Sequence, residues 1–322
     1  MQQLQLRGIA STLAVSRLVL GTDYFGSGVD REVAFQILDA YVAAGGNMLD
    51  TARCYADWVP GGHGASERTI AQWLVRSGAR ARVLISTKGG HPRLDAMQRS
   101  RISLEEVSRD LEESLETLGI GCIDIYWLHR DDESQPVEKI MDMLAAVTSN
   151  GSVRAIGCSN WRAERLEAAN QYAARQGISR FCASQLQWSL ALSSATAQED
   201  ETRVVMDPAE LERYRRNRVP VIAYTSQAKG FFSRPLSGPH AANDKALRWF
   251  VNPANLARRQ RVQELSQRTG LAATAIVLGY VLDNGIDAMA LIGPRSLAQL
   301  QDSITAAERV LSAGELAYLT GD

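Results

Sequence analysis

The sequence predicts an α/β fold in which eight parallel strands close into a (β/α)8 barrel of the TIM type. Short apolar segments rich in β-branched and aliphatic residues alternate with longer helical patterns along the whole chain. Strands that read as continuous apolar runs are typical of a parallel sheet covered by helices. The alternation repeats eight times within 322 residues, which is a suitable length for a single closed barrel.

The first four units carry clear strand signals, such as the letters RLVL, VLIST and IDIYWL. Their strands are predicted at Arg17–Leu20, Asn47–Leu49, Val83–Thr87 and Ile123–Leu128. A helical pattern follows each strand, and these helices are predicted at Asp30–Ala44, Ser66–Arg76, Ser103–Leu118 and Val137–Thr148.

The second half of the chain repeats the pattern, with the apolar runs VPVIA and AMALI among its strands. These strands are predicted at Val153–Gly157, Phe181–Ser184, Val219–Ala223 and Ala288–Ile292. The helices are predicted at Arg162–Arg175, Pro208–Arg216, Pro253–Thr269, Ala272–Leu282 and Leu297–Val310, and a C-terminal helical extension completes the fold.

Outside the repeating units, the sequence predicts an N-terminal hairpin and two long loops. Leu4–Leu6 and Leu13–Val15 flank a glycine and predict an N-terminal β-hairpin that closes one end of the barrel. No linker interrupts the pattern, so residues 1–322 are predicted to form one domain. The long connections Ala195–Met206 and Gly230–Asn252 are expected to be lids or binding loops. For the first of them, a surface excursion is an equal alternative.

The composition excludes several classes of protein. Lys+Arg 35 and Asp+Glu 36 give a net charge of -1, so no long-range attraction to nucleic acid or to an anionic membrane is expected. The four cysteines form no CxxC pair and predict neither a zinc motif nor a disulfide framework. No signal-like segment is visible at the start, and the longest apolar stretch, around Ala272–Leu282, is too short to span a bilayer. We therefore expect a cytoplasmic protein, and the sequence favours neither a monomer nor a homo-oligomer.

Polar residues stand where five successive apolar strands end. They are Asp50, Lys88, His129, Asn160 and Gln185. The carboxyl ends of the strands of a parallel barrel meet on one face, where barrel enzymes place their active sites. Any one of these residues alone would more often be a structural strand-end group, but five from five successive strands predict a functional site.

The residue types at this face suit proton transfer to an oxygen. Tyr55 follows Asp50 in the segment LDTARCY, so both are expected at the same open end of the barrel. A phenol has a pKa of about 10, and a nearby ammonium favours the phenolate. Lys88 is therefore expected to lower the pKa of Tyr55, and Asp50 to keep Lys88 charged. His129 is expected to orient the oxygen or share its proton, and the whole set suits protonation of a carbonyl oxygen.

Reduction of a carbonyl would also require a hydride, which no side chain can supply, so a cofactor is implied. The sequence lacks GxGxxG after a strand and GxxxxGK[ST], so a nicotinamide cofactor would have to bind to barrel loops. Ser159, Asn160 and Gln185 can hydrogen-bond a carboxamide, and Trp188 can stack on its ring. The segment GPRS (293–296) opens a helix after the last strand, and a helix start with an arginine suits the phosphate monoester that distinguishes NADP from NAD.

Seven motifs, in order and over nearly the whole chain, resemble those of the aldo-keto reductases. They are LDTARCY, ISTKGG, IDIYWLHR, IGCSNW, SQLQW, VIAYTSQAKGF and GPRSLAQLQDS. The opening LRGIASTLAVSRLVLGTDYFG resembles the family's hairpin and first strand, and GASERTIAQWL its second helix. The resemblance implies a (β/α)8 barrel, NADPH-dependent reduction of an aldehyde or ketone, and no metal ion.

The same resemblance implies roles at named positions. It places the family's catalytic tetrad on Asp50, Tyr55, Lys88 and His129. It places NADP(H) contacts on Thr22, Asp23, Asp50, Ser159, Asn160, Gln185, Trp188, Tyr224, Thr225, Ser226, Gln227, Lys229, Gly230, Gly293, Arg295, Gln299 and Ser303. In this interpretation the hydride comes from the nicotinamide and the proton from Tyr55.

Four features depart from the family pattern. Thr225–Gln227 replaces the usual Ser-Pro-Leu, and Gly293-Pro294 replaces the Pro-Gly of many members. Ser303 stands where an asparagine often helps to hold the adenine, and Ala56 replaces a common glycine after the tyrosine. None of these positions belongs to the tetrad.

Residues beside these motifs have plainer interpretations. Cys54 is predicted to be a buried filler, with redox sensing as the alternative. His63 and His91 are predicted to be loop residues rather than ligands. Arg53 and Arg130 are predicted to point outward to solvent, with substrate contacts as the alternative.

The substrate is expected to contact aromatic side chains. Trp58 and Trp249 are the candidate substrate contacts, and they lie in loops that mix aromatic and polar residues. For Trp58, a surface anchor of its loop is an equal alternative. We expect sugar-like or small polar aldehydes and ketones rather than steroids.

Two other classes of function stay open. One is a cofactor-binding sensor or regulatory barrel with little or no turnover, by analogy with family members attached to ion channels. The other is a barrel hydrolase with paired carboxylates such as Asp50 and Asp124. Asp124 lies early in its strand, and a hydrolase would leave Lys88 and Tyr55 unexplained.

Overall fold

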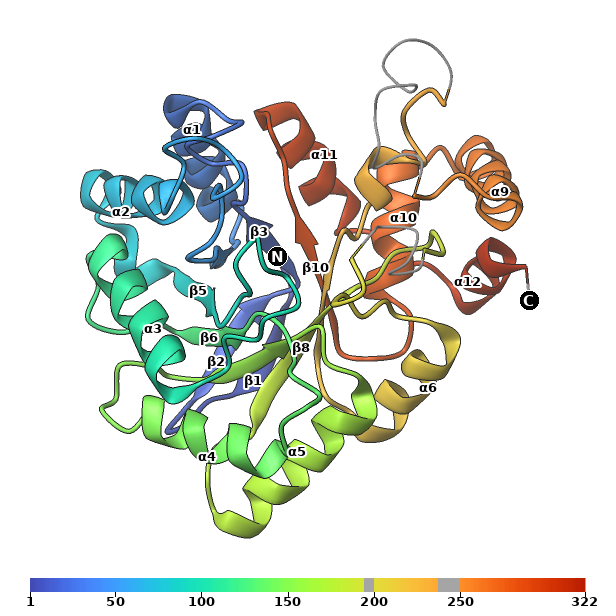
Figure 1. Ribbon diagram of the computed structural model, residues 1–322. Coiled ribbons are helices and arrows are strands. Elements are labelled where there is room, and N and C mark those ends of the chain that lie inside the picture. Colours follow the sequence, from blue (N-terminus) through green and yellow to red (C-terminus); the bar gives the residue numbers. More distant parts are fainter. Residues whose placement is uncertain (194–199, 237–248, 322) are drawn as a thin grey trace.

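Eight parallel strands form a closed barrel in the computed structural model, which describes residues 1–193, 200–236 and 249–321 (Figure 1). The order around the barrel is β10-β3-β4-β5-β6-β7-β8-β9. The strands are β3 (Leu18–Gly21), β4 (Met48–Asp50), β5 (Leu84–Gly89), β6 (Ile125–Leu128), β7 (Ile156–Ser159), β8 (Phe181–Gln187), β9 (Val221–Tyr224) and β10 (Ala288–Ile292). The predicted (β/α)8 architecture is confirmed.

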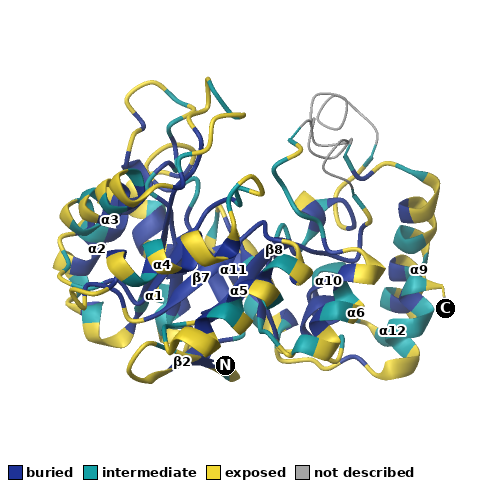
Figure 2. Cartoon of the chain, turned by 60° about the horizontal axis from the view of Figure 1, so that its bottom comes forward, coloured by how far each residue is buried: buried dark blue, intermediate teal, exposed yellow. Residues whose placement is uncertain are grey.

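Helices cover the outside of the barrel, so the strands are buried on both faces (Figure 2). They are α1 (Arg31–Ala43), α2 (Ala65–Ser77), α3 (Leu104–Leu118), α4 (Val137–Val147), α5 (Ala163–Gln176), α6 (Pro208–Asn217), α9 (Pro253–Thr269), α10 (Ala273–Leu282), α11 (Leu297–Ala306) and α12 (Ala313–Thr320). Two short 3-10 turns, η1 (Ala79–Arg82) and η3 (Ala228–Gly230), lie in the connections.

Local sequence signals explain where many of these helices begin and end. The side chains of six residues accept a hydrogen bond from the first turn of the helix that follows them, which satisfies an amide otherwise without a partner. These residues are Asp30, Ser103, Asp207, Asn252, Ser296 and Ser312. Several helices end at a glycine with positive φ, as α3 does at Gly119 with a φ of 64°.

The observed bounds differ most from the predicted ones at three places. β7 begins at Ile156 instead of Val153. β8 continues past Ser184 because its end pairs with β9, so Gln185 lies inside this strand and not at its end. α11 ends at Ala306, and a capping box at Ser312 starts α12, which is the C-terminal helical extension.

The predicted N-terminal hairpin is confirmed and fills one end of the barrel. β1 (Gln3–Arg7) pairs antiparallel with β2 (Thr12–Ser16), and Figure 2 shows β2 at the lower end of the barrel. The buried side chains Leu6, Leu13 and Val15 pack against interior residues such as Trp127. Trp127 fits because Gly157 lies opposite it, and a Cβ there would come within 2.2 Å of the indole. The hairpin thus leaves only the other end of the barrel open.

No helix in the described part of the chain is both long and apolar enough to cross a membrane.

Candidate active site

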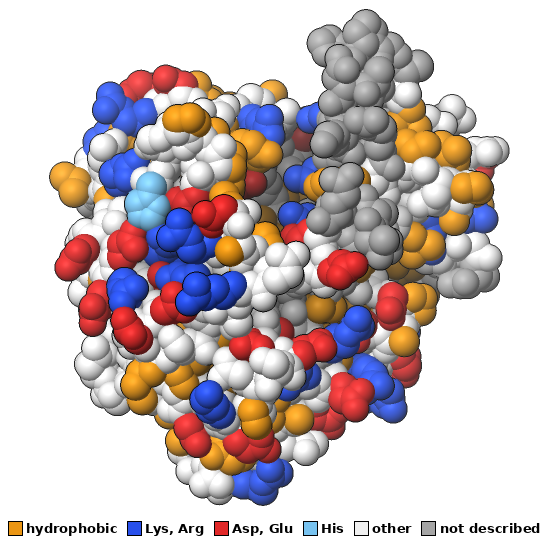
Figure 3. All heavy atoms as spheres, viewed as in Figure 1, with side chains coloured by type: hydrophobic (Ala, Val, Ile, Leu, Met, Phe, Trp, Pro, Cys, Tyr) orange, Lys and Arg blue, Asp and Glu red, His pale blue; other side chains and the backbone are white. Residues whose placement is uncertain are grey.

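A cavity of about 1380 Å³ opens at the carboxyl ends of the strands. Its walls come from the loops after β3, β4, β5, β6, β7, β9 and β10 and from residues inside or just after β8. Figure 3 shows that this surface is hollowed near its middle. The cavity is larger than a typical pocket for one small ligand, so it has room for a large cofactor together with a substrate.

A fully buried ion pair lies beneath the floor of the cavity. Lys88 at the end of β5 and Asp50 at the end of β4 are 1% and 0% exposed, and Lys88 Nζ lies 2.5 Å from Asp50 Oδ2. The other carboxylate oxygen of Asp50 accepts hydrogen bonds from Ser86 and Gln185 at 2.7 and 3.0 Å. A buried charge pair is tolerated only when its remaining hydrogen-bonding atoms find partners, as they do here.

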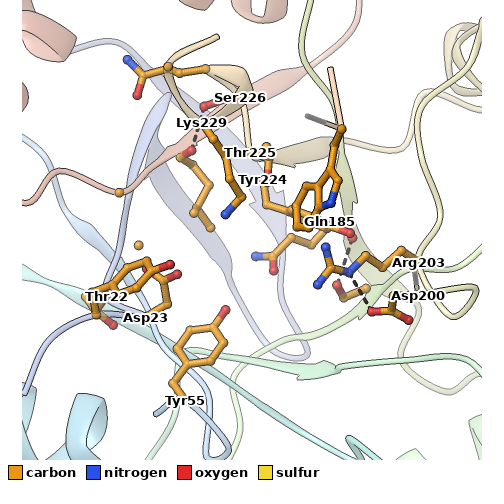
Figure 4. A pocket seen from close by; sticks show the side chains of 18 of the residues that line it. Thr22, Asp23, Tyr55, Gln185, Asp200, Arg203, Tyr224, Thr225, Ser226 and Lys229 are labelled. Atoms are coloured by element: carbon orange, nitrogen blue, oxygen red, sulfur yellow. Dashed lines mark hydrogen bonds and ion pairs between the residues drawn. The ribbon is translucent and has the colours of Figure 1, made fainter. Parts of the chain in front are cut away.

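Lys88 holds the hydroxyl of Tyr55 at the floor of the cavity. Its ammonium donates to Asp50, to the carbonyl of Thr51 at 2.7 Å and to Tyr55 Oη at 2.9 Å. An ammonium has three donors and no acceptor, so all three are used and Tyr55 Oη must be the acceptor. The hydroxyl proton of Tyr55 is therefore free to point into the cavity, as the side chain does in Figure 4.

The expectation that Lys88 lowers the pKa of Tyr55 is wrong. Burial raises the pKa of Tyr55 well above its ordinary value, and the nearby carboxylate of Asp50 adds to the shift. The physical reason is that Asp50 offsets the charge of Lys88, so the desolvation of a phenolate dominates. Tyr55 is consequently a neutral phenol at neutral pH, which is the form that can donate a proton.

His129 follows β6 and faces the same part of the cavity. Its ring centre lies 6.0 Å from that of Tyr55. Burial lowers the pKa of His129 well below its ordinary value, and the neighbouring His91 and Arg130 add to the shift. The imidazole is therefore neutral, so His129 is suited to orient an oxygen by a hydrogen bond rather than to supply the proton.

A hydroxyl network fixes the rim that carries Asp50 and Tyr55. Thr22 Oγ1 donates to the carbonyl of Asp50 at 2.9 Å, and Ser66 Oγ lies 2.8 Å from the hydroxyls of both Thr22 and Thr51. All three hydroxyl residues are buried. The start of α2 is thereby tied to the ends of β3 and β4, and the loop between β4 and α2 has fixed anchors.

Across the cavity, a second network joins the ends of β6, β7 and β9. Asn160 Nδ2 donates to Ser159 Oγ at 3.0 Å and to the carbonyl of His129 at 3.2 Å, and its Oδ1 accepts from the hydroxyl of Tyr224 at 2.7 Å. Asn160 has a φ of 61°, a left-handed conformation that asparagine tolerates better than most residues. Ser159, Asn160, Gln185 and Tyr224 all line the cavity.

Trp188 lies away from this wall, contrary to the expectation that it stacks on a cofactor ring. Its side chain is 2% exposed, packs edge-on against Tyr280 and does not line the cavity. The extension of β8 to Gln187 carries the chain past the rim before Trp188 is reached. The aromatic surface beside Asn160 is provided by Tyr224 instead.

The loop after β9 has an unusual backbone. Thr225, Ala228 and Lys229 have φ values of 55°, 46° and 51°, which are uncommon for residues other than glycine. Such conformations cost of order 1–3 kcal/mol each and are found preferentially at ligand sites and switch regions. Figure 4 shows Lys229 pointing into the cavity, with Ser226 bonded to the backbone of β10 at 2.7 Å.

The loop after β10 forms the far end of the cavity at the start of α11. The backbone N–H of Arg295 donates to Gln299 Oε1 at 2.8 Å, and its guanidinium lies 3.8 Å from the ring centre of Tyr24. Gln227 reaches across to Ser303 at 3.4 Å, so the loops after β9 and β10 meet here. A helix start and an arginine together form a site for an anion.

Among the predicted cofactor contacts, all but Asp50 and Trp188 line this one cavity. Tyr55 and His129 also line it, and Asp50 and Lys88 lie directly beneath Tyr55. The predicted substrate contacts Trp58 and Trp249 are in the wall as well.

Comparison with known proteins agrees with this arrangement. A model of the aldo/keto reductase family matches residues 17–321. The chain belongs to the aldo/keto reductase family. Members of this family are oxidoreductases that act on carbonyl groups and the corresponding alcohols.

Three curated relatives illustrate how far the similarity extends. The norsolorinic acid reductase stcV of Emericella nidulans is 28% identical over 94% of this chain and 77% of its own length. The uncharacterized oxidoreductase YrpG of Bacillus subtilis is 28% identical over 92% and 88%. The putative aryl-alcohol dehydrogenase AAD14 of Saccharomyces cerevisiae is 28% identical over 98% and 85%.

One departure from the pattern of the aldo/keto reductases has a visible structural consequence. Ala56 stands directly after Tyr55, where glycine is common, and has a φ of 72°. The left-handed conformation is therefore retained without glycine, at a cost of roughly 1–2 kcal/mol. The turn at Ala56 directs the following loop, including Trp58, back over the cavity.

Arg130 was expected to point to solvent but is 7% exposed and lines the cavity. It donates to the carbonyl of His129 at 2.9 Å and to Thr202 Oγ1 at 2.8 Å, and lies 3.5 Å from Asp200. Asp200 and Thr202 lie in the first long loop, whose residues 195–199 fall outside the described part of the chain. The signal that could have found Arg130 is its place directly after a strand-end residue.

Of two further residues near the tetrad, Arg53 differs from its prediction, whereas His91 lies in a loop as predicted. Arg53 does not point freely to solvent, because it lies 3.3 Å from the buried carboxylate of Asp110 and also contacts Asp57 and Glu113. His91 is 8% exposed and packs against the ring of His129 with a centre-to-centre distance of 4.6 Å.

Cys54 is buried, as predicted, yet it lines the cavity. Burial raises the pKa of its thiol to about 11. A thiol of this kind has little thiolate at neutral pH, which argues against the redox-sensing alternative.

The structure also separates the two carboxylates of the hydrolase alternative. Asp124 precedes β6 and lies at its amino end, whereas Asp50 lies at the carboxyl end of β4. Asp124 is bonded to Arg154 at 2.7 Å and to Arg80 at 2.9 Å. The pair therefore has no common site in which to hydrolyse a substrate.

Proposed function

We propose that this protein reduces an aldehyde or a ketone to the alcohol with NADPH. The observation that carries the proposal is the presentation of the Tyr55 hydroxyl to the cavity by the buried Lys88–Asp50 pair, beside a neutral His129. A protonated phenol next to a neutral hydrogen-bond donor suits an oxygen that gains negative charge as it is reduced.

The cavity fits a nicotinamide dinucleotide. Its lining runs from the amide and hydroxyl groups of Ser159, Asn160 and Gln185, past the strained loop after β9, to the helix start at Arg295. Lys229 and Arg295 lie near Asp23, at the end of the cavity proposed to hold the phosphates. Burial raises the pKa of Asp23, and the charges of these two cations partly counteract that shift. When bound, the nicotinamide supplies the hydride that no side chain of the chain can supply.

The side chains at the floor divide the proton chemistry among them. Lys88 fixes the position of Tyr55 Oη, so the phenol proton points to the carbonyl oxygen in the cavity. His129 orients that oxygen, and Asp50 anchors Lys88 from below. In this proposal Tyr55 donates the proton as negative charge develops on the oxygen, and water restores the phenol afterwards.

Arg295 is proposed to select NADPH over NADH. It is exposed at the start of α11, where its guanidinium and the amide groups of the first turn can bind the phosphate monoester. We expect Arg295→Ala to raise KM for NADPH about 10–100-fold, because a charge-assisted hydrogen bond to the phosphate is lost. KM for NADH should stay nearly unchanged. Arg309→Ala, at an exposed arginine just beyond α11, is the control and should alter neither constant. An equal increase in KM for NADPH and for NADH would contradict the role of Arg295 in selecting NADPH.

The substrate is proposed to lie between Tyr55 and the aromatic wall. The rings of Tyr55 and Trp58 are 6.3 Å apart, and Trp249 lies near the guanidinium of Arg203 at 5.6 Å. Sugar-like carbonyls fit the mixture of aromatic and polar groups, as the sequence predicts. Aryl carbonyls are the second class to compare, because the name of one relative refers to aryl alcohols.

A binding measurement and a substrate screen together test the proposal. NADPH binding is measured by fluorescence titration, and NADPH oxidation is followed with a panel of aldoses, small keto sugars and aryl aldehydes. We expect micromolar or tighter binding and oxidation with at least one class of carbonyl. Tight binding without oxidation of any compound would instead favour a sensor with little or no turnover.

A further inference from the structure

Three residues of the cavity wall form a cluster that the proposed reaction does not fully use. Cys54, His91 and His129 follow three successive strands, β4, β5 and β6. Their sulfur and ring nitrogen atoms all lie within 4.8 Å of one another. Each side chain is buried and also lines the cavity, so a small ion can reach the cluster from the open end of the barrel. We call these residues the Cys54–His91–His129 cluster.

The ring of His91 is held by a hydrogen bond to the backbone. Its Nδ1 lies 2.6 Å from the carbonyl of Pro92. A carbonyl only accepts hydrogen bonds, so Nδ1 carries the proton and Nε2 has the lone pair. Histidines that bind metals commonly donate their other ring N–H to a carbonyl in this way, because the bond fixes the tautomer and the ring orientation.

The other two members of the cluster face each other. Cys54 Sγ lies 3.6 Å from His129 Nδ1, a separation close to that between two ligands of one tetrahedral metal ion. The ligand atoms of all three residues thus lie close together, within 4.8 Å of one another.

We propose that the Cys54–His91–His129 cluster binds a Zn²⁺ ion and that this ion inhibits the enzyme. One sulfur and two nitrogen ligands suit a borderline cation such as Zn²⁺ and not Mg²⁺ or Ca²⁺, which prefer oxygen. Three protein ligands leave the fourth position open to the cavity. Inhibition follows because the ion and its bound water would occupy cavity space beside His129 and Tyr55, whose ring centres are 6.0 Å apart. The inhibitory role rests on the proposed function, whereas binding of the ion does not.

Binding exchanges a proton for the metal without any change of oxidation state. The S–H bond of Cys54 breaks, the thiolate sulfur and the two ring nitrogens bond to Zn²⁺, and the proton passes to solvent. A water molecule completes the coordination. The net charge of the site therefore rises by one when a divalent ion replaces one proton.

The charges around the cluster set the conditions for binding. Arg130 and Lys88 oppose a cation, as their effect on His129 indicates. Asp50 offsets the charge of Lys88 at 2.5 Å, and Asp200 partly offsets that of Arg130 at 3.5 Å. The thiolate of Cys54 adds a negative charge inside the site itself once the metal is bound.

The first test measures metal binding without reference to activity. The metal-free protein is titrated with Co²⁺ as a spectroscopic probe, and Zn²⁺ is then added to displace it. We expect one Co²⁺ per chain, with a thiolate-to-cobalt charge-transfer band in the near ultraviolet. Loss of a group that merely orients a ligand costs about 10–100-fold in affinity, so loss of a ligand in Cys54→Ser or His91→Ala should cost at least about 100-fold.

Matched controls come from the same residue types elsewhere in the chain. Cys122→Ser removes a partly exposed thiol, and His63→Ala removes an exposed imidazole that contacts Asp57 and Glu113. Both should keep the band and the affinity. Because Cys54→Ser and His91→Ala act independently, either variant suffices if the other fails to fold. Unchanged affinity in a folded Cys54→Ser or His91→Ala protein, or loss of binding in a control, would overturn the site.

The second test measures inhibition with a carbonyl compound that the enzyme reduces. We expect Zn²⁺ to lower turnover reversibly, with recovery on addition of a chelator, and His91→Ala to shift the inhibition constant by the same factor as its binding constant. Each variant is compared with its own metal-free rate. Binding without inhibition would overturn the inhibitory role and leave the proposed reaction intact. A protein that binds the ion but reduces no carbonyl would instead contradict the proposed function.

Discussion

Replacement of Tyr55 by phenylalanine should lower turnover by at least about 100-fold, the usual contribution of a general acid, and leave NADPH binding unchanged. The substitution removes only the hydroxyl that Lys88 presents to the cavity at 2.9 Å. The ring stays in place beside Trp58, so the shape of the cavity is preserved. The measurement is kcat with a reducible carbonyl, together with Kd for NADPH by fluorescence titration.

The control is Tyr172→Phe, which removes a hydroxyl on the exposed face of α5 that bonds to Asp142. It should leave both kcat and Kd unchanged. Near-normal turnover in Tyr55→Phe would contradict the assignment of Tyr55 as proton donor. A loss of NADPH affinity with unchanged kcat would assign Tyr55 to cofactor binding instead.

Replacement of Lys88 by methionine should abolish turnover and also destabilise the fold. The carboxylate of Asp50 is 0% exposed and would lose its counterion while remaining in the interior. Breaking a buried pair in this way costs about 3–5 kcal/mol in the free energy of unfolding. The measurement is denaturant unfolding together with kcat, and Lys139→Met at an exposed position of α4 is the matched control.

A double variant separates the two effects of Lys88. Asp50→Asn combined with Lys88→Met removes both charges, so much of the lost stability should return while turnover stays low. If the double variant is no more stable than Lys88→Met, the loss does not come from an unpaired carboxylate. If turnover returns with stability, Lys88 has only a structural role.

The repeating pattern of strands and helices carries enough information to predict the barrel. Apolar runs such as VLIST and AMALI are buried strands because parallel strands are covered on both faces. The rule that strand ends share one face then places Asp50, Lys88 and His129 together before any coordinates are known. The order of elements therefore determined most of the candidate site.

The features that sequence reasoning missed depend on packing distances. The length of β8, and with it the burial of Trp188, depends on how far that strand pairs with β9. The pKa of Tyr55 depends on how closely Asp50 approaches Lys88 and on how far burial excludes water from the floor of the cavity. His91 looks like an ordinary loop residue in the sequence, and only the fold of its loop brings it beside His129. Arg130 follows His129 directly, but its burial in the cavity wall depends on contacts with Thr202 and Asp200.

The most direct test of the proposed reaction follows one labelled atom. The protein is incubated with a carbonyl compound and NADPH in which both hydrogens at nicotinamide C4 are replaced by deuterium, and the alcohol is analysed by mass spectrometry. The account predicts one deuterium on the former carbonyl carbon, formed at least about 100-fold more slowly by Tyr55→Phe than by the wild-type protein. An alcohol without deuterium, or labelled alcohol formed equally fast by both proteins, would contradict it.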